Sequence, residues 1–216
     1  MDKQDLINCL TSKPDIDALA AAAVQNKALL NSMFDIVATQ RTSACYGCIK
    51  VICRVSQTKP ELIYPYFDTC AGWLYHPNSF IKWDAIAILS NLVQVDRDNK
   101  FVPIYQPYFD LIGDTHMITA SNVIKNAWKI ALAMPNAEDD ITRRLLGVPG
   151  NIYLHKGSPS AECNRIACGH VLQCFDYYFY CSGSQPQMLA FAQSQLDSQC
   201  KLVARAARRF LNKYGR

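Results

Sequence analysis

Glycine and proline are scarce in this sequence, with 9 and 10 residues among 216. Loop-rich β-proteins use these residues heavily in turns and bulges, so their scarcity argues against an all-β fold. No run of 18 or more apolar residues occurs, which argues against a membrane-spanning helix. The sequence also lacks a phosphate-binding glycine loop, a G-x-S-x-G pattern and an H-E-x-x-H pattern. The usual signatures of nucleotide-binding proteins, serine hydrolases and zinc proteases are therefore absent.

The beginning of the chain lacks the features of a secretory signal. Residues 1–5 (MDKQD) provide neither a basic start nor a following apolar stretch. Ten cysteines without such a signal favour reduced thiols over a disulfide framework. We therefore expect a cytoplasmic protein that does not bind a membrane.

The balance of hydrophobic and charged residues is that of a globular protein, at 50% and 19% of the chain. The net charge of +4 is unevenly distributed, because residues 1–100 carry 10 basic and 10 acidic residues and residues 101–216 carry 12 and 8. The final segment, 201–216, has six basic residues and no acidic one. This asymmetry fits an acidic partner or nucleic acid, and it also fits a solvated C-terminal face.

One segment of the chain recurs at a fixed distance. The four residues Pro-Tyr-Phe-Asp stand at 65–68 and again at 107–110, 42 positions later. The same shift places Ala85 on Ala127 and Ile88 on Ile130. A period near 40 residues is typical of proteins in which helix pairs stack side by side. The sequence therefore predicts an all-α fold of the solenoid type.

Helical spacing of apolar residues predicts the individual elements. Pro60 fits the first turn of an outer helix, whereas Pro65 and Pro107 should kink the outer helices in which they lie. Residues 147–160 are too rich in Gly, Pro and Ser to be helical, and no strand is predicted. The expected helices span 2–10, 17–24 with Asp15 as its cap, 26–39, 41–55, 60–75, 79–96, 99–114, 121–134, 138–146, 161–180, 185–195 and 197–214.

The predicted domain organisation is a single repeat domain over 1–216. Residues 1–25 form N-terminal cap helices, and 26–135 form the regular repeats. Residues 147–160 form a loop insertion, which in such folds often lies on the binding face. Residues 161–216 form the C-terminal repeats.

The inner helices of the pairs can be aligned on one alanine. A small residue at this position would let neighbouring helices approach closely, so we expect the column to be buried. The column comprises Ala44, Ala85, Ala127, Ala167 and Ala207. Three residues later stand Gly47, Ile88, Ile130, His170 and Phe210.

The segment 81–92 (IKWDAIAILSNL), with weaker copies at 122–128 and 203–211, resembles the HEAT-repeat family. The proline and aspartate of the outer helices add to the resemblance, which covers roughly residues 26–216 with a degenerate fourth repeat. It implies a right-handed α-α superhelix of about five HEAT-like helix pairs. It also implies a non-catalytic scaffold that binds a partner, most often a protein, on the concave face of the inner helices. One bacterial branch with HEAT-like repeats consists of DNA glycosylases that excise alkylated purines, so nucleic-acid binding with base excision is the alternative.

Two positions on the inner helices predict a partner-binding stripe on the concave side. They lie two residues before the shared alanine and one turn further on. The stripe is aromatic toward the N-terminus and basic toward the C-terminus, so it could hold a phosphate backbone or an acidic peptide. The other interpretation pairs the basic residues with the outer-helix aspartates Asp68 and Asp110, whose repetition argues against a catalytic role. The predicted site residues are Tyr46, Trp83, Lys125, Lys129, Arg165, Arg205 and Arg209.

Two pairs of residues suggest other chemistry. Cys45 and Cys48 have the spacing of a zinc or redox pair, but Cys48 falls in a core column where cysteine packs as a small hydrophobe. His170 and Cys174 are four residues apart, but His170 falls in the column of buried isoleucines, so we expect a core histidine. We therefore expect no metal, no cofactor, no catalytic cluster and no small-molecule substrate. A metal or thiol sensor based on Cys45 and Cys48 remains a third hypothesis.

Overall fold

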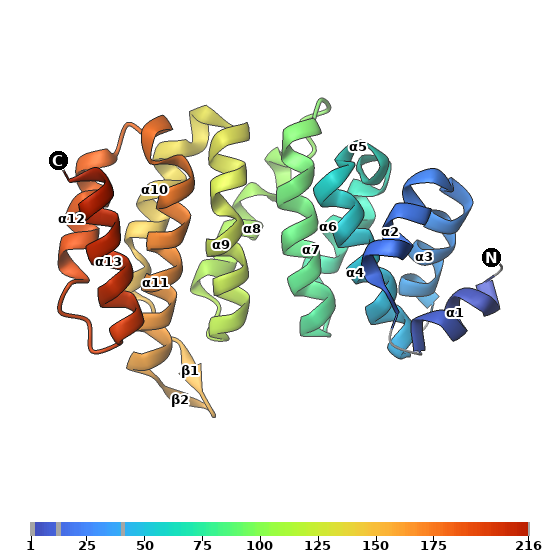
Figure 1. Ribbon diagram of the computed structural model, residues 1–216, viewed down its shortest axis with the longest axis horizontal. Helices are drawn as coiled ribbons and strands as arrows, with labels where there is room; N and C mark the ends of the chain where they lie inside the picture. The colour runs from blue at the N-terminus through green and yellow to red at the C-terminus, as the bar shows by residue number, and fades with distance from the viewer. Residues whose placement is uncertain (1–2, 12–13, 40–41, 216) are drawn as a thin grey trace. The chain divides into compact units, whose positions relative to one another are not determined.

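The protein is almost entirely helical, which confirms the predicted all-α class (Figure 1). The computed structural model describes residues 3–11, 14–39 and 42–215. In this part of the chain, no helix is both long and apolar enough to cross a bilayer.

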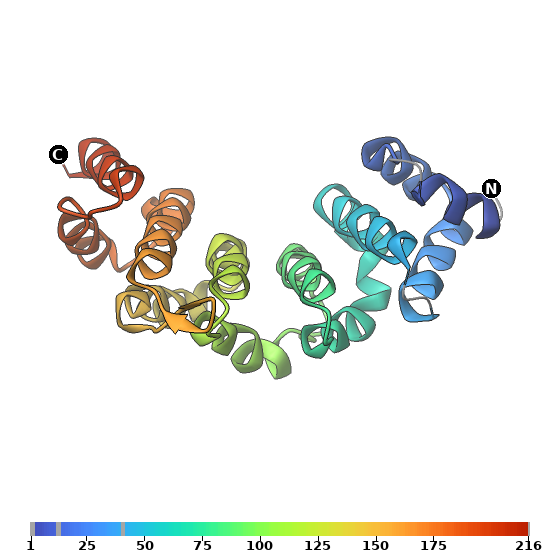
Figure 2. The same ribbon diagram turned by 90° about the horizontal axis from the view of Figure 1, so that it is seen from below.

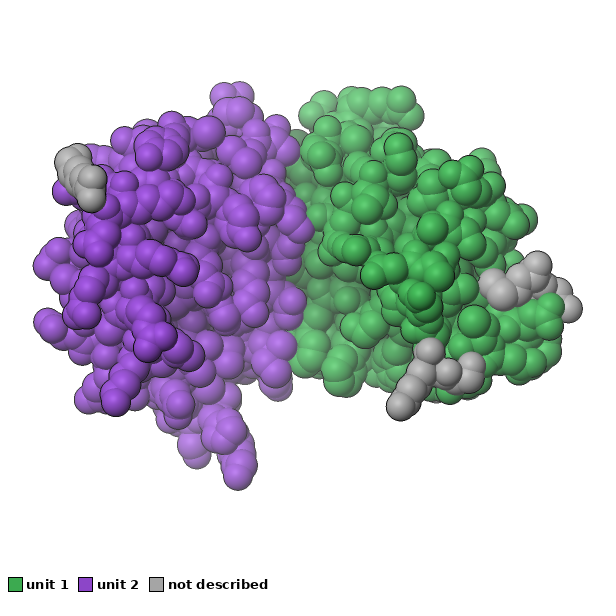
Figure 3. All heavy atoms as spheres, in the orientation of Figure 1, with its two compact units in different colours: residues 1–102 green, residues 103–216 purple. Residues whose placement is uncertain are grey.

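The chain divides into two compact units, Met1–Val102 and Pro103–Arg216 (Figure 3). The single domain with its four segments stays a prediction. In unit 1 the α-helices are α1 (Lys3–Thr11), α2 (Ile16–Gln25), α3 (Lys27–Thr39), α4 (Ser43–Thr58), α5 (Pro60–Ile63), α6 (Phe67–Gly72) and α7 (Ser79–Leu92). Short 3-10 turns are η1 (Tyr64–Tyr66), η2 (Trp73–Tyr75) and η3 (Val93–Val95).

Unit 2 repeats the alternation of outer and inner helices. Its α-helices are α8 (Tyr105–Asp110), α9 (Met117–Ala133), α10 (Glu138–Leu146), α11 (Ala161–Tyr178), α12 (Gln185–Ser194) and α13 (Lys201–Tyr214). Its 3-10 turns are η5 (Leu111–Gly113), η6 (Pro135–Ala137), η7 (Val148–Gly150) and η8 (Phe179–Cys181), while η4 (Val102–Ile104) lies at the boundary between the units.

Within each unit the helices form two layers (Figure 2). In unit 1, α4 packs against α2, α3 and α7, and in unit 2, α11 packs against both α9 and α13. We call α4, α7, α9, α11 and α13 the inner helices, because these five carry the alanine column. The expected first inner helix began at Arg41, which lies outside the described residues, and the observed α4 begins at Ser43.

The alanine column is fully buried, as predicted. Its five members each have an exposed fraction of 0%. Gly47, one turn after Ala44, has a similar role, because a Cβ there would lie 2.7 Å from Leu10 Cδ2 of α1. The small residues therefore set the spacing between packed helices, as close packing requires. His170 departs from the prediction: it is only half-buried, whereas Ile88 and Ile130 are fully buried.

Pro65 interrupts its outer helix at the predicted place, whereas Pro107 does not interrupt the helix in which it lies. Pro65 lies in η1, a 3-10 turn that separates α5 from α6, because its ring cannot continue the α-helix. The expected helix 99–114 is wrong in detail, since α8 begins only at Tyr105. Pro107 therefore stands in the first turn of α8, where its missing N–H removes no helical hydrogen bond.

The insertion 147–160 contains a small hairpin that the sequence did not predict. Strands β1 (Leu154–His155) and β2 (Ser158–Pro159) pair antiparallel, and the pairs are Leu154 with Pro159 and His155 with Ser158. The turn needs two residues of positive φ, and Lys156 and Gly157 supply them at 51° and 82°. Each strand has only two residues, too few for the alternation that marks a strand in sequence.

In each unit, a tyrosine of an outer segment donates a hydrogen bond to an aspartate that lies further along the chain. The Tyr64 hydroxyl donates to Asp96 at 2.7 Å, and the Tyr105 hydroxyl donates to Asp140 at 2.8 Å. Burial, together with the hydrogen bond to Asp96, raises the pKa of Tyr64 to about 12. Each tyrosine therefore remains protonated and able to donate in its own repeat.

The outer-helix aspartates bind cations of the following outer segment, not of the inner helices. Asp68 accepts from Lys100 Nζ at 2.8 Å, and Asp110 lies 3.6 Å from Arg144. This corrects the interpretation that Asp68 and Asp110 neutralise the basic residues of the inner helices. The basic residues of the inner helices are therefore not neutralised by Asp68 or Asp110.

The buried alanine column generates a stability prediction. Ala127→Leu should overpack the 0% exposed site on α9 and lower the free energy of unfolding by about 1–3 kcal/mol. Ala133→Leu adds the same atoms at an exposed position of the same helix and should change it by less than about 0.5 kcal/mol. Urea unfolding followed by circular dichroism measures both changes. Equal effects of the two substitutions would contradict the assigned packing.

Asp140 generates a prediction about pH. Burial alone would raise its pKa, but hydrogen bonds from Arg144 at 2.6 Å and Tyr105 at 2.8 Å lower it below the ordinary value of 3.8. A pKa lowered in the folded state adds stability above pH 3.8, and this stability is lost as the pH falls through the lowered pKa. Asp140→Asn should therefore destabilise the protein at neutral pH, and the difference from wild type should shrink in acid. Urea unfolding at a series of pH values measures the difference, and Asp139→Asn on the exposed side of α10 is the control. A difference independent of pH would count against this assignment.

Candidate partner-binding groove

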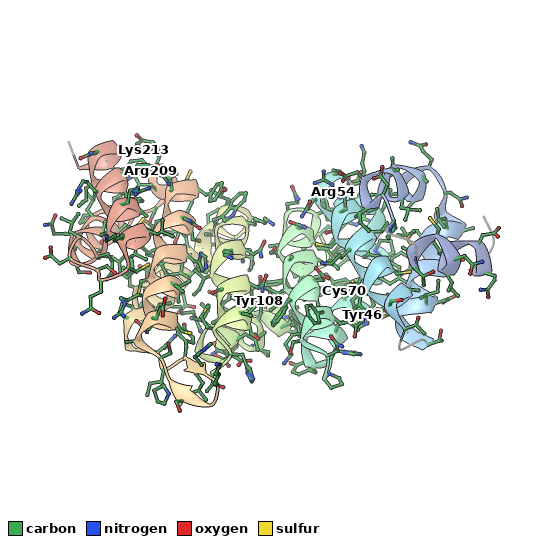
Figure 4. All side chains as sticks on the ribbon, turned by 60° about the horizontal axis from the view of Figure 1, so that its bottom comes forward. Tyr46, Arg54, Cys70, Tyr108, Arg209 and Lys213 are labelled. Carbon is green, nitrogen blue, oxygen red and sulfur yellow. The ribbon has the colours of Figure 1, made fainter. Side chains whose placement is uncertain are left out.

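Helices α9, α11 and α13 of unit 2 enclose an open groove of about 620 Å³, which we call the α9–α13 groove. Three of the predicted basic residues line it: Lys125 and Lys129 from α9, and Arg209 from α13. Lys125 and Lys129 share one face of α9 because they are four residues apart. Figure 4 shows Arg209 on α13, one turn from Lys213. The groove thus brings together cations from two inner helices.

Lys129 is positioned by its neighbours on α9. Its ammonium donates to Asn126 Oδ1 at 2.7 Å and lies 5.8 Å from the centre of the Trp128 ring. A cation over an indole ring is attracted by the negative face of the ring. The contacts therefore hold this charge at the wall of the groove.

An aromatic pair forms another wall of the groove. Trp128 of α9 and Tyr177 of α11 stack with ring centres 4.5 Å apart and an interplanar angle of 14°. Tyr177 is 62% exposed despite this contact. Tyr177 was not predicted from the sequence, because it lies ten residues beyond Ala167, outside the single turn that was considered around the alanine column.

One carboxylate also lines the groove. Asp176 of α11 accepts from Lys213 Nζ at 2.9 Å and from the Tyr214 hydroxyl at 2.9 Å, both on α13. The hydrogen bond with Tyr214 raises the pKa of Lys213 most, and the hydrogen bond with Asp176 raises it further. Three cations and one carboxylate line the groove, so its lining has a net charge of +2. Lys213 is not one of the lining residues. The electrostatic character of the groove is therefore positive, with polar Asn126 and Gln173 between the charges.

The remaining predicted residues lie elsewhere. In unit 2, Arg205 is exposed on α13, and Arg165 lines a separate hollow of about 480 Å³ beside Ile152 and Tyr153 near the hairpin. In unit 1, Tyr46 and Trp83 are joined through Phe80, which was not predicted from the sequence, with ring centres 5.9 and 5.2 Å from it. The structure thus places Lys125, Lys129 and Arg209 at one groove, and Arg165 at another.

Cys48 is buried, as the repeat register predicted, and Cys45 is buried as well. Cys45 and Cys48 are 3% and 0% exposed, and burial raises both pKa values, that of Cys48 to about 12 with a further contribution from Cys45. Cys174 is 1% exposed and its pKa is also raised by burial. In the described part of the chain, no group of three or more His, Cys, Asp or Glu side chains could hold a metal ion.

His170 and Cys174 do not form a catalytic pair in this structure. The Nδ1 atom of His170 lies 3.4 Å from Gln173 Oε1. Burial lowers the pKa of His170, and the neighbouring charge of Lys125 lowers it further. The ring is therefore neutral at physiological pH. Burial raises the pKa of the Cys174 thiol, which disfavours the reactive thiolate.

The burial of the thiols predicts their reactivity. With a pKa of about 12, roughly 1 in 10,000 molecules carries the Cys48 thiolate at pH 8. Brief treatment of the folded protein with iodoacetamide should therefore label exposed Cys181 and leave Cys45 and Cys48 unlabelled. Peptide mass spectrometry measures the labelling, and urea-unfolded protein is the control in which all three should react. Rapid labelling of Cys45 or Cys48 in the folded protein would revive the thiol-sensor hypothesis.

Comparisons with known proteins give a limited answer. No protein-family model matches the sequence. No curated protein matches it either. Among solved structures, the chain is similar to the crystal structure of an engineered protein, with 14% sequence identity, coverage of 100% of this chain and 97% of that chain, and a TM-score of 0.49.

Proposed function

We propose that this chain is a non-catalytic helical-repeat scaffold that holds an acidic segment of a partner protein in the α9–α13 groove. The observation that carries the proposal is the convergence of Lys125, Lys129 and Arg209 beside the stacked Trp128–Tyr177 pair. Carboxylates of the partner would pair with the cations, while its apolar side chains would pack on the exposed Tyr177 ring.

The architecture that we propose for this scaffold is a right-handed α-α superhelix of about five HEAT-like helix pairs. The fully buried alanine column and the tyrosine–aspartate hydrogen bond that is present in each unit support it. In a repeat architecture of this kind each pair buries its apolar face only on its neighbours. The inner-helix face is then the surface on which a partner would be bound.

The chemistry of the groove favours binding over catalysis. Lysine and arginine ammonium and guanidinium groups supply charge and hydrogen bonds, but at their ordinary protonation they are poor general bases. The one carboxylate, Asp176, is engaged by Lys213 and Tyr214. Cys174, which also lines the groove, has a thiol whose pKa is raised by burial. A groove with these groups is suited to hold an anionic segment without reacting with it.

Two features favour an acidic peptide over nucleic acid. Asp176 places a carboxylate in the groove. This carboxylate repels a continuous phosphate backbone more strongly than it repels a peptide whose carboxylates are spaced apart. Asn126 and Gln173 offer side-chain amides, which can hydrogen-bond to both N–H and C=O groups of a peptide backbone.

Nucleic-acid binding, with base excision as its enzymatic form, is the second candidate. The exposed face of Tyr177, stacked on Trp128 and surrounded by cations, is the observation that favours it, because a base can stack on such a surface. A base-excision enzyme would also need a carboxylate or other group to activate water, and Asp176 is held by two hydrogen bonds from α13. The same experiment separates the two candidates.

Charge reversal in the groove tests the proposal. A fluorescein-labelled peptide of alternating Glu and Leu should bind the wild-type chain, and fluorescence anisotropy measures its affinity. Arg209→Glu should weaken binding roughly tenfold or more, because it removes a cation and adds a repelling carboxylate. Arg208→Glu is the matched control: it makes the same charge change at the next, exposed position of α13, outside the groove. This control should stay within about threefold of wild type.

The outcomes of this experiment are distinct. Equal losses in the two variants would show that only net charge matters and would sink the proposal. A fluorescein-labelled single-stranded oligonucleotide of ten residues is measured in parallel. If it binds more tightly than the peptide and only Arg209→Glu weakens it, the nucleic-acid candidate replaces the acidic-peptide one.

A further inference from the structure

A second hollow, of about 330 Å³, lies in unit 1 and shares no residue with the α9–α13 groove. The N-terminal part of α4 and the segment that leads into α7 form it. Figure 4 labels Tyr46, which contributes its ring from α4. Of the described residues that line this hollow, none is an aspartate, glutamate, lysine or arginine. A ligand for it is therefore selected by hydrogen bonds and apolar contact.

Hydrogen bonds to Asn78 fix the orientation of the polar groups in this hollow. The Asn78 side-chain amide donates to the Tyr46 hydroxyl oxygen at 2.6 Å, and the Asn78 backbone N–H donates to His76 Nδ1 at 3.0 Å. The Asn78 Oδ1 atom accepts from Phe80 N at 2.9 Å, where it caps α7. The backbone N–H, the side-chain NH₂ and the Oδ1 atom of Asn78 are thus all engaged within unit 1.

These contacts leave two hydrogen-bond donors for a ligand, one on Tyr46 and one on His76. Because the Tyr46 oxygen already accepts from Asn78, its own proton remains to be donated. Because Nδ1 of His76 accepts, the ring carries a proton on Nε2. Within the described part of the chain, neither proton is donated to an acceptor. A ligand that presents carbonyl oxygens is complementary to these two donors.

The surroundings of the hollow are apolar and aromatic. Pro77 and Ile81 line it beside the Tyr46 ring. Phe80 packs edge-on against Tyr46 and against Trp83, and is itself 58% exposed. Three aromatic rings from two inner helices thus contact one another in a row that begins at the hollow with Tyr46, and we call this row the Tyr46 shelf.

We propose that the Tyr46 hollow and shelf bind a proline-rich segment of a partner protein in the polyproline II conformation. Each proline residue presents a carbonyl acceptor and no N–H, so its carbonyl can accept from Tyr46 and His76. Proline rings pack on aromatic faces, and the polyproline II helix loses little conformational entropy on binding. This site is separate from the proposed function, because its residues all belong to unit 1 and it carries no net charge.

A fluorescein-labelled decaproline peptide tests this proposal with the full chain. It should bind with an affinity that is unchanged between about 50 and 300 mM NaCl, because no charged pair is involved. Tyr46→Phe removes one donor and keeps the ring, so it should weaken binding roughly fivefold. Phe80→Ala removes the exposed ring of the shelf and should weaken it roughly tenfold. Fluorescence anisotropy measures each affinity, and circular dichroism checks that each variant is folded.

Two control variants distinguish binding at the Tyr46 shelf from binding elsewhere on the chain. Tyr75→Phe removes a hydroxyl from a 70% exposed tyrosine outside the hollow and should bind as wild type does. Arg209→Glu should also leave decaproline binding intact, so the acidic-peptide proposal can fail without affecting this one. No decaproline binding at millimolar concentration, equal binding of a glycine–serine decapeptide, or wild-type affinity of Tyr46→Phe would each overturn the proposal.

Discussion

The close approach of neighbouring inner helices is the constraint on which the other features depend. It rests on small residues: the five alanines of the column are all fully buried. In unit 1, Gly47 of α4 also leaves room for Leu10 of α1. When helices pack this closely in a fixed register, side chains at the same offset from the alanine occupy corresponding faces. Lys125, Lys129 and Arg209 meet in unit 2 for this reason, although they come from segments far apart in the chain.

Periodicity made much of the fold predictable from sequence. The alanine column, the Asp15 cap of α2 and the break at Pro65 follow from local rules, and the structure confirms each. Features that depend on single contacts were not predictable. The hairpin at 154–159 depends on one two-residue turn, and His170 is half-buried although its column predicts a core residue. The 42-residue repeat located the outer aspartates, but it could not identify their cation partners, Lys100 and Arg144.

The candidate sites were predictable to a smaller extent than the fold. Three of the seven predicted residues, Lys125, Lys129 and Arg209, line the α9–α13 groove. Tyr177, Asp176 and Phe80 were missed because their roles depend on where side chains meet across helices, not on their offset from the alanine. The two proposed sites also differ chemically. One is positive and suited to carboxylates, and the other offers hydrogen-bond donors and aromatic faces without net charge.

Central to the proposed function is that the cations of α9 and α13 act together on a single acidic ligand. A crystal structure of the chain with a bound peptide of alternating Glu and Leu tests this joint action. We expect glutamate carboxylates within hydrogen-bond distance of both Lys125 and Arg209, with a leucine side chain against Tyr177. A peptide bound outside the α9–α13 groove, or one that contacts neither Lys125 nor Arg209, would contradict it.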